Sequence, residues 1–364
     1  MMTRDTTSLF LLLYIVTLSG CQGGGSIYSN FHDVAELQVV QTLGYDRSGD
    51  TVTLSVSTGP GTEELPGVIL RGSGESIPDA MSRLQEQSAR QELFFAHVRF
   101  VVVGEEAART GLRELLDWFE RMPQTRLDVP LFVVEGGEAA SLFREGEEGG
   151  ELTSALLSIQ RDTEKEGFSF CTTVGEAARF LSGRDWTLCC ALLPSDTPGE
   201  EHSTVRENGF ALLQEGSLTD FTGTETAVGL CLLMNETGSG SVILPDGQGG
   251  RVTVSLSGVR TDSDAAAGEG GAPELTVTLR CRAGLTDVDS SLWDEELLSG
   301  ADSALADWAL SRTADALRFL YRHGIGLPGT ADPKPMDTVI KVSARVERSY
   351  DLSAAGNLHR EAAP

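Results

Sequence analysis

Apolar and polar residues alternate in several short runs of this chain, and a period of two along the sequence is typical of β-strands. In the run 51–57, Val52, Leu54 and Val56 alternate with threonine and serine, so one face of this strand is expected to be buried. The run 37–43 precedes it, and the polar residues 46–50 between the two runs predict a hairpin. Further strands are predicted at 131–134, 185–193, 209–213 followed by a turn and Leu218, 242–244, 251–259, 274–283 and 339–346.

The most apolar segment of the first half is Leu93–Val103, whose last residues are largely β-branched and do not alternate with polar ones. This pattern predicts an interior strand with both faces covered. Residues 112–119 carry an apolar stripe at helical spacing, and a helix there is expected to pack across the strand, with Glu114 exposed. A second stripe over 77–84 is expected to supply more of the cover.

Two helix starts carry capping signals in the sequence. Ser76 is followed by Asp79, and Thr173 by Glu176, which are the residue types and the spacing of capping boxes. These positions predict where two helices begin. Helices are predicted at 76–91, 112–122, 138–144, 153–164 and 173–181.

The second half of the chain contains the longest predicted helix, over residues 293–323. Gly324 and Gly326 follow it and are expected to end it, because glycine adopts the left-handed conformation that terminates helices. The apolar run 227–234 fits either a helix or a strand. The segment 262–273 is rich in glycine, alanine and acids, which predicts a mobile loop at the tip of a hairpin. The buried face of the long helix is expected to carry Leu310, Leu317, Leu320 and Tyr321.

Residues 1–25 have the pattern of a lipoprotein signal peptide. The run Leu9–Leu18 has a single polar residue and is too short for a bilayer core of about 30 Å, but it has the length of a signal-peptide apolar region. It ends in Leu18-Ser19-Gly20-Cys21, the lipobox pattern, which predicts cleavage before Cys21 and a diacylglyceryl group on its sulfur. The glycine-rich residues 22–26 would then form a flexible tether. A buried first helix with a chance cysteine is the alternative.

The order of the elements predicts an α+β fold of several domains, with mixed and antiparallel sheets and packed helices. Polar segments rich in glycine or proline near 145–150 and 195–204 are interpreted as boundaries. The predicted organisation is a signal peptide at 1–20, a lipidated cysteine and tether at 21–26, an N-terminal region at 27–200 that divides near 145–150, a C-terminal domain at 205–352 and a tail at 353–364.

The charge of the chain excludes some partners. Lysine and arginine total 28 against 54 aspartates and glutamates, a net charge of −26. Such a chain repels phosphate, which argues against nucleic-acid binding and against attraction to anionic lipid headgroups. The anchor is therefore expected to be the acyl chains on Cys21.

The remaining cysteines do not form a recognisable motif. Their odd number and the lack of metal-ligand spacing favour unpaired, small core residues, with a redox or disulfide role as the alternative. They are Cys171, Cys189, Cys190, Cys231 and Cys281.

His97, Arg99 and Glu105–Glu106 are candidates for an acid–base cluster, since His97 and Arg99 would share one face of a strand. A structural role is favoured, because no serine or cysteine stands in a recognisable nucleophile elbow. Gly72-Ser73-Gly74 lacks the flanking pattern of such an elbow.

The acidic pairs Glu147–Glu148 and Glu200–Glu201 lie in loop segments and could bind Ca²⁺ weakly. No calcium-loop spacing accompanies them, so solvated charges are the favoured interpretation. The sequence therefore predicts no enzyme activity, no catalytic or metal site and no cofactor, and leaves Cys21 as its one predicted site residue.

Several motifs of the chain share the pattern of one known family. They are Leu43-Gly44-Tyr45-Asp46, Ser76-Ile77-Pro78-Asp79-Ala80, Phe94-Phe95-Ala96-His97-Val98-Arg99, Val102-Val103-Gly104-Glu105-Glu106-Ala107-Ala108, Gly111-Leu112, Leu115-Leu116-Asp117-Trp118-Phe119-Glu120-Arg121, Arg126-Leu127, Asn208-Gly209-Phe210-Ala211-Leu212 and Gly229-Leu230. With the lipobox at Cys21 and a long helix before a final valine-rich strand, the chain resembles the Ger(x)C family over nearly its whole length. These proteins are the lipoprotein C subunits of bacterial spore germinant receptors.

The resemblance implies several α+β domains and a subunit without catalytic activity. It implies a complex with two membrane-embedded partners, the A and B subunits, in the spore inner membrane, where the C subunit is held on the outer face by acyl chains such as palmitate on Cys21. Nutrient germinants would trigger this receptor complex in spore germination. The alternative function is a surface-tethered solute-binding or hydrolytic lipoprotein unrelated to germination. A solute-binding protein would show two α/β lobes joined by hinge strands, whereas the second half of this chain predicts hairpins.

Overall fold

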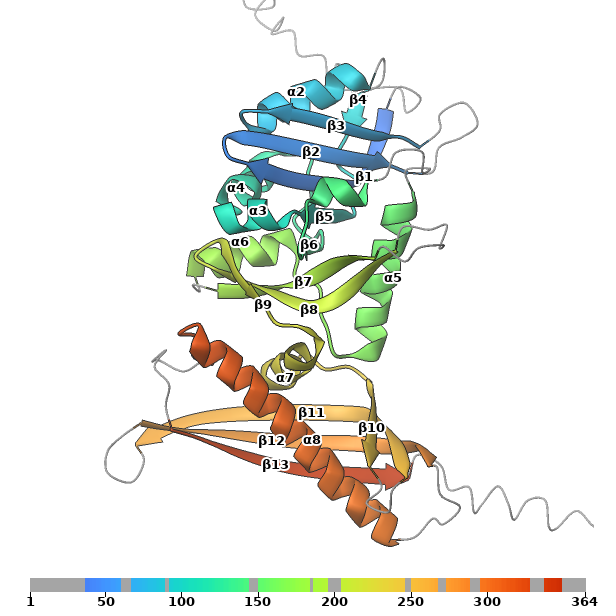
Figure 1. The fold of residues 1–364 in the computed structure, drawn as a ribbon, viewed down its shortest axis with the longest axis vertical. Coiled ribbons are helices and arrows are strands. Elements are labelled where there is room, and N and C mark those ends of the chain that lie inside the picture. The colour runs from blue at the N-terminus through green and yellow to red at the C-terminus, as the bar shows by residue number, and fades with distance from the viewer. Residues whose placement is uncertain are drawn as a thin grey trace, which may run out of the picture.

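The computed structural model describes ten segments of the chain, and they form two β-sheets with packed helices (Figure 1). One sheet has nine strands and the other has four, and each contains parallel and antiparallel pairs. The predicted α+β class with mixed sheets is confirmed. The described residues are 37–59, 67–88, 92–143, 150–183, 186–195, 204–245, 250–267, 273–288, 295–327 and 337–348.

The first sheet has hairpins at its two ends and parallel strands in its centre. Its order is β3-β2-β1-β5-β6-β7-β8-β9, and β4 also pairs with β1. The hairpins β1–β2 and β8–β9 are antiparallel, which confirms both sequence predictions. The strands are β1 (Leu37–Ser48), β2 (Thr51–Thr58), β3 (Ile69–Gly74), β4 (Glu92–Phe94), β5 (Phe100–Val103), β6 (Leu131–Val134), β7 (Trp186–Ser195), β8 (Thr204–Gln214) and β9 (Ser217–Phe221).

The prediction of one strand over Leu93–Val103 was wrong, because this segment forms the two short strands β4 and β5 with a turn between them. Both pair in parallel with β1: Phe94 lies opposite Val39, and Phe100 lies opposite Thr42. The segment between β4 and β5 is therefore longer than the part of β1 that it passes, and the excess leaves the sheet as a turn. His97 lies in this turn and not on a strand.

Helices cover both faces of the first sheet, as the apolar character of β5 predicts. Val101 and Val103 join the core that contains the helices α2, α3, α4 and α6, whereas Phe100 and Val102 join the core with α5 and η3. The short helix α3 was not predicted. The helices are α2 (Ile77–Gln87), α3 (Glu105–Thr110), α4 (Arg113–Arg121), η3 (Ala139–Leu142, a 3₁₀ helix), α5 (Glu151–Glu166) and α6 (Val174–Gly183).

Both predicted N-caps form, and the box at Thr173 is complete, whereas at Ser76 the Asp79 carboxylate accepts from the Glu75 amide. The Ser76 hydroxyl accepts from the Asp79 amide at 3.4 Å at the start of α2. At the start of α6 the Glu176 carboxylate accepts from the Thr173 amide at 2.9 Å, and the Thr173 hydroxyl accepts from the Glu176 amide at 3.2 Å. These bonds satisfy amide groups that the first turn of a helix leaves without a helical partner.

The second sheet has the order β10-β11-β12-β13, with β13 parallel to β12. Helix α8 crosses one face of this sheet, and α7 packs against α8 (Figure 1). The ambiguous run 227–234 is part of the helix α7. The elements are α7 (Thr224–Met234), β10 (Ser241–Pro245), β11 (Arg251–Ala267), β12 (Pro273–Val288), α8 (Glu295–Arg322) and β13 (Asp337–Arg348).

Two predictions for this half were wrong. Residues 262–273 were expected to form a loop, but β11 runs to Ala267 and β12 begins at Pro273, because the ladder between the strands continues through their exposed polar residues. Leu310 was expected on the buried face of α8 and is 39% exposed. Leu317 and Leu320 are buried as predicted, and Ala309 is buried in place of Leu310. Ala316, also buried, lies against Gly229 of α7.

The segment near 195–204, expected to be a domain boundary, connects β7 to β8, which are paired strands of the first sheet. The change from one sheet to the other comes after β9, where α7 begins. The backbone ladder therefore continues across that expected boundary. The division of the chain into domains stays a prediction, and the segment near 145–150 lies mostly outside the described residues.

The cysteines after Cys21 are all free, which agrees with the prediction of unpaired core residues. Cys189 and Cys190 are buried in β7 and join the cores on opposite faces of the first sheet. Burial raises the pKa of the Cys189 thiol to about 12, so this cysteine stays an uncharged, small apolar residue near neutral pH.

We predict that Leu116→Ala lowers the free energy of unfolding by about 2–5 kcal/mol, because truncation of a buried leucine leaves a cavity. Leu116 is 5% exposed and lies in the core between α4 and the first sheet. Urea denaturation of the purified protein measures the change.

The matched control is Glu120→Ala on the exposed face of α4, which is expected to leave the midpoint nearly unchanged. Glu114, predicted to be exposed, is unsuitable because its carboxylate accepts from the Arg47 guanidinium at 2.6 Å. Equal midpoints for Leu116→Ala and Glu120→Ala would contradict the packing of α4.

We further predict that Gly229→Ala lowers the free energy of unfolding by about 1–3 kcal/mol, through overpacking that exceeds the gain in helix propensity of up to about 1 kcal/mol. A Cβ atom at Gly229 would lie 2.0 Å from the backbone oxygen of Arg312 in α8. Gly258→Ala is the control, since a Cβ atom there would meet nothing within 4 Å. A Gly229→Ala protein as stable as the wild type would show that α7 and α8 separate without cost.

Candidate functional site

The predicted lipidation site Cys21 and its tether lie outside the described residues, so lipidation stays a prediction. The acidic pairs Glu147–Glu148 and Glu200–Glu201 lie outside them as well. Within the described part of the chain, no group of three or more histidine, cysteine, aspartate or glutamate residues is placed to hold a metal ion. Among the helices of that part, none combines the length and apolar character needed to cross a membrane.

The candidate acid–base residues are not gathered into one site. His97 lies in the turn after β4, with its ring centroid 5.7 Å from that of Phe94. Glu105 forms an ion pair at 2.7 Å with Arg109, which also lies in α3. Its carboxylate accepts from the amide of Gly136, after β6, at 2.6 Å. Glu106 is exposed. These contacts support the structural roles that the sequence favours.

The Gly72-Ser73-Gly74 segment is part of an ordinary strand. Ser73 lies on β3, and its hydroxyl is 2.9 Å from that of Thr53 on the neighbouring strand. A Cβ atom at Gly72 would lie 2.3 Å from the backbone oxygen of Ala80, so this glycine permits α2 to approach β3. The segment therefore fits a packing role, which agrees with the absence of an elbow pattern.

A buried carboxylate lies where β1, β5 and η3 meet. Asp46 is 7% exposed, and its two oxygens each accept an amide at 2.7 Å, one from Ala139 and one from Ala140, in the first turn of η3. A Cβ atom at Gly104 would lie 2.0 Å from an Asp46 oxygen, so glycine is needed at this contact. The Arg71 guanidinium donates to the Ala140 carbonyl at 2.7 Å and secures the same turn.

Burial raises the pKa of the Asp46 carboxyl to about 6, although the amides of Ala140 and Ala139 act in the opposite direction. A raised pKa means that the folded state holds this proton more tightly than the unfolded state does. The contacts of Asp46 are all within the fold, and we interpret it as the residue that fixes η3 against β1, not as a catalytic acid.

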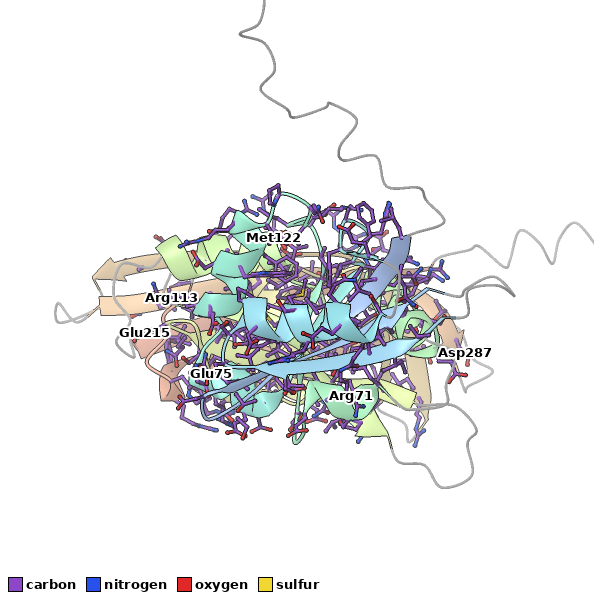
Figure 2. The ribbon with its side chains drawn as sticks, turned by 90° about the horizontal axis from the view of Figure 1, so that it is seen from above. Arg71, Glu75, Arg113, Met122, Glu215 and Asp287 are labelled. Carbon is purple, nitrogen blue, oxygen red and sulfur yellow. The ribbon has the colours of Figure 1, made fainter. Side chains whose placement is uncertain are left out.

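A groove of about 720 Å³ lies beside α4 and the turn between β8 and β9. Arg113 and Glu215 line it and lie on the same side of the molecule in Figure 2. Opposite charges meet in this groove, since Arg47 pairs with Glu114 at 2.6 Å and Arg121 pairs with Asp117 at 3.0 Å. This mixture of charges does not select a ligand of one sign.

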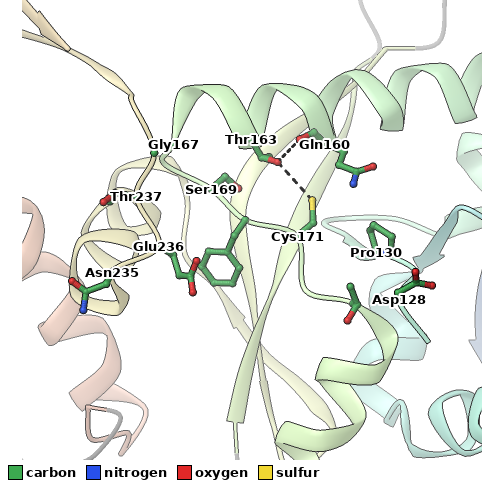
Figure 3. A pocket seen from close by; sticks show the side chains of 13 residues that line it. Asp128, Pro130, Gln160, Thr163, Gly167, Ser169, Cys171, Asn235, Glu236 and Thr237 are labelled. Atoms are coloured by element: carbon green, nitrogen blue, oxygen red, sulfur yellow. Dashed lines mark hydrogen bonds between the residues drawn. The ribbon is translucent and has the colours of Figure 1, made fainter. Parts of the chain in front are cut away.

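A pocket of about 390 Å³ lies between the end of α5 and the end of α7, and we call it the junction pocket (Figure 3). Its walls come from four places: the segment before β6, the last turns of α5, the segment 167–173 between α5 and α6, and residues 235–238 after α7. A second cavity of about 170 Å³ shares Phe170, Cys171 and Glu236 with it. We call this the aromatic lobe, and its other residues include Phe180, Trp186 and Met234.

No pattern in the sequence predicted the junction pocket. Gly167 and Asn235 are positioned as helix C-caps, with φ of 70° and 60°, and glycine or asparagine after an apolar stretch is a sequence signal for such caps. That signal marks where each helix ends, but only the packing of α5 beside the segment after α7 brings the two ends together.

Three comparisons with known proteins agree with one another. The model of the spore germination protein N-terminal domain matches residues 30–193, which include β1 to most of β7. The spore germination protein YfkR of Bacillus subtilis (strain 168) is 23% identical over 213 residues, which are 58% of this chain and 54% of that protein. The match thus spans about half of the length of this relative.

The crystal structure of the GerBC protein has a similar fold. It superposes with a TM-score of 0.56 over 84% of this chain and 96% of that one, at 13% sequence identity. At this identity the likeness concerns the fold alone, and it extends over both sheets and not only over the part that the domain model matches.

We predict that the stabilising effect of Asp46, relative to an Asp46→Asn variant, decreases as the pH rises from about 4 to above 6. The folded pKa of about 6 lies above the ordinary value of 3.8, so the contribution is fully present below pH 3.8 and is lost as pH rises through 6. At about 1.4 kcal/mol for each pKa unit, the decrease is about 3 kcal/mol at most.

Urea denaturation of both proteins across this pH range measures the difference between their free energies of unfolding. The variant removes the titrating group, so charges elsewhere largely cancel in the comparison. A difference in free energy of unfolding that stays constant with pH would mean that the two amide bonds balance the effect of burial, so that the carboxyl keeps an ordinary pKa. A difference that grows with pH would mean that they outweigh burial and lower the pKa.

Proposed function

Because this chain is a Ger(x)C family protein of spore germination, we propose that it is the non-enzymatic lipoprotein subunit of a nutrient-germinant receptor. In this proposal acyl chains on Cys21 hold it on the outer face of the spore inner membrane. Its partners there are the membrane-embedded A and B subunits of the receptor.

The observation that carries the proposal is the position of the matched domain. The spore germination N-terminal domain begins at residue 30, shortly after the lipobox cysteine and the predicted tether at 22–26. A tether of this kind gives the folded part freedom to move beside a bilayer while the acyl chains stay in it. The net charge of −26 supports a lipid anchor over electrostatic attraction to the membrane surface.

The scattered positions of the polar candidates support a role without catalysis. A nucleophile and its base need to lie within hydrogen-bond reach, and among the described residues His97 contacts Phe94 while Ser73 contacts Thr53. The alternative is a surface-tethered solute-binding or hydrolytic lipoprotein. A hinge-bound binding protein has two α/β lobes, whereas the second sheet here is a meander of hairpin strands with a final parallel strand.

We predict that Cys21→Ala abolishes lipidation and membrane retention, because this substitution removes the sulfur that carries the diacylglyceryl group. Spores of a strain that expresses the variant are lysed and fractionated, and the chain is followed by immunoblotting. Ser26→Ala in the predicted tether is the matched control and is expected to stay in the membrane fraction. Retention of a processed Cys21→Ala chain in that fraction would place the anchor elsewhere.

The receptor role is tested in the same spores by the response to nutrient germinants. Deletion of the gene is expected to abolish the response to at least one nutrient, while germination by a non-nutrient trigger such as dodecylamine is unchanged. A deletion strain that responds normally to every nutrient that triggers the parent would contradict the proposed function.

A further inference from the structure

We propose that the junction pocket and its aromatic lobe bind a small organic ammonium ion, with the charged group beside Glu236 and its apolar body against the aromatic side chains. This inference goes beyond the proposed function and does not depend on it. It rests on four features of the described residues: the sign of the charge, the end of α7, the lining of the aromatic lobe, and the rigidity of the walls.

The charge at the pocket is negative. Among the described residues that line the two cavities there are three acids, Asp128, Glu176 and Glu236, and no lysine, arginine or histidine. Asp128 pairs with the neighbouring Arg126, and Glu176 serves the capping box of α6. Glu236 is exposed and has no side-chain partner within the described part of the chain, so its charge is available to a cation.

The end of α7 adds to this preference. The C-terminus of a helix carries partial negative charge from carbonyl groups that have no helical partner. Helix α7 ends at Met234, with no basic residue in its last turn, and both Met234 and Asn235 line the cavities. Helix α5 ends beside it and has Lys165 in its last turn, but Lys165 is exposed and does not line the pocket.

The aromatic lobe suits the body of an organic cation. Phe170, Phe180, Trp186 and Met234 are half-buried there, and the Phe170 ring is fixed by the Phe210 ring, whose centroid is 4.6 Å away. The faces of aromatic rings attract ammonium groups and also bury apolar carbon. A ligand with an ammonium group and an apolar body is therefore expected to bind more tightly here than a metal ion or a neutral polar solute.

The backbone on both sides of Glu236 is fixed before any ligand arrives. The preceding Asn235 accepts from the Thr261 amide at 2.6 Å and donates to the Thr261 carbonyl at 3.0 Å. The Gly238 amide donates to the Gly167 carbonyl at 3.1 Å, and these two glycines are in close contact. A site held in this way loses little conformational entropy when it binds.

These features distinguish the ligand class. A carboxylate would face Glu236 with no lining cation to pair with, so anionic compounds are disfavoured. A neutral analogue keeps the aromatic contacts and loses the attraction to Glu236. Among compounds of similar shape, we therefore expect the affinity to be highest for the ammonium ion, lower for the neutral compound and lowest for the anion.

The test uses 2-phenylethylammonium, neutral 2-phenylethanol and anionic 3-phenylpropionate as probes on the purified full-length protein. Binding is measured by isothermal titration calorimetry and by protein-detected NMR. We expect saturable binding of the ammonium, and an affinity that falls about threefold to tenfold in Glu236→Gln. Trp186→Leu is expected to weaken the ammonium and the alcohol alike. Glu106→Gln, an exposed acid on α3, is the control and is expected to change neither affinity.

The inference is overturned if the ammonium does not bind, if Glu236→Gln leaves its affinity unchanged, or if 3-phenylpropionate binds as tightly. Thermal denaturation of each variant shows that it is folded before binding is compared. Loss of ammonium selectivity in a folded Glu236→Gln protein supports the site, whereas membrane fractionation and spore germination report separately on the proposed function.

Discussion

The backbone ladder of β1 is the interaction on which the first sheet depends. One edge of this strand pairs with β2, and the other edge pairs first with β4 and then with β5. The parallel strands β6 and β7 extend the sheet from β5, so a change in the position of β1 would move every later strand. Asp46 near the end of β1 accepts both amides that begin η3, which joins this strand to one of the covering elements.

Covering both faces of β5 and β6 explains why helices surround this sheet. Their residues alternate between two cores, so neither face can be left to water without exposing valine and phenylalanine. In the second sheet, the described helices cover one face only. Its inner face packs on α7 and α8, whereas its outer face carries mainly arginine, lysine and threonine, with Ile243 and Val339 exposed among them.

The two sheets meet through α7, and this contact links the fold to the proposed functions. Gly229 lets α7 approach the backbone of α8, and Asn235 at its end bonds to β11. The same helix end contributes to the junction pocket beside α5. A ligand in this pocket would contact elements of both halves of the chain, so its binding can stabilise their relative position. If the proposed function holds, this would give the subunit a way to respond to a small molecule without catalysis.

Local patterns in the sequence determined much of the fold. The period of two in β2, β11 and β12 fixes which residues face the core, and the capping boxes at Ser76 and Thr173 fix where two helices begin. These features depend on residues that are close together in the chain, so they can be predicted from the sequence. The lipobox at Cys21 is likewise a local motif, and it supports a prediction of anchoring without any knowledge of the fold.

Contacts between distant residues decided the rest. The break in Leu93–Val103 follows from its register against β1. The long ladder of β11 past Asp262 follows from its pairing with β12. The local pattern of apolar residues therefore predicts neither feature. The burial of Ala309 in place of Leu310 depends on how α8 packs in the core of the second half. The junction pocket arises only where the ends of α5 and α7 meet. The sequence by itself determined most of the elements and the predicted anchor, whereas tertiary packing decided register, buried faces and cavities, because these depend on residues far apart in the chain.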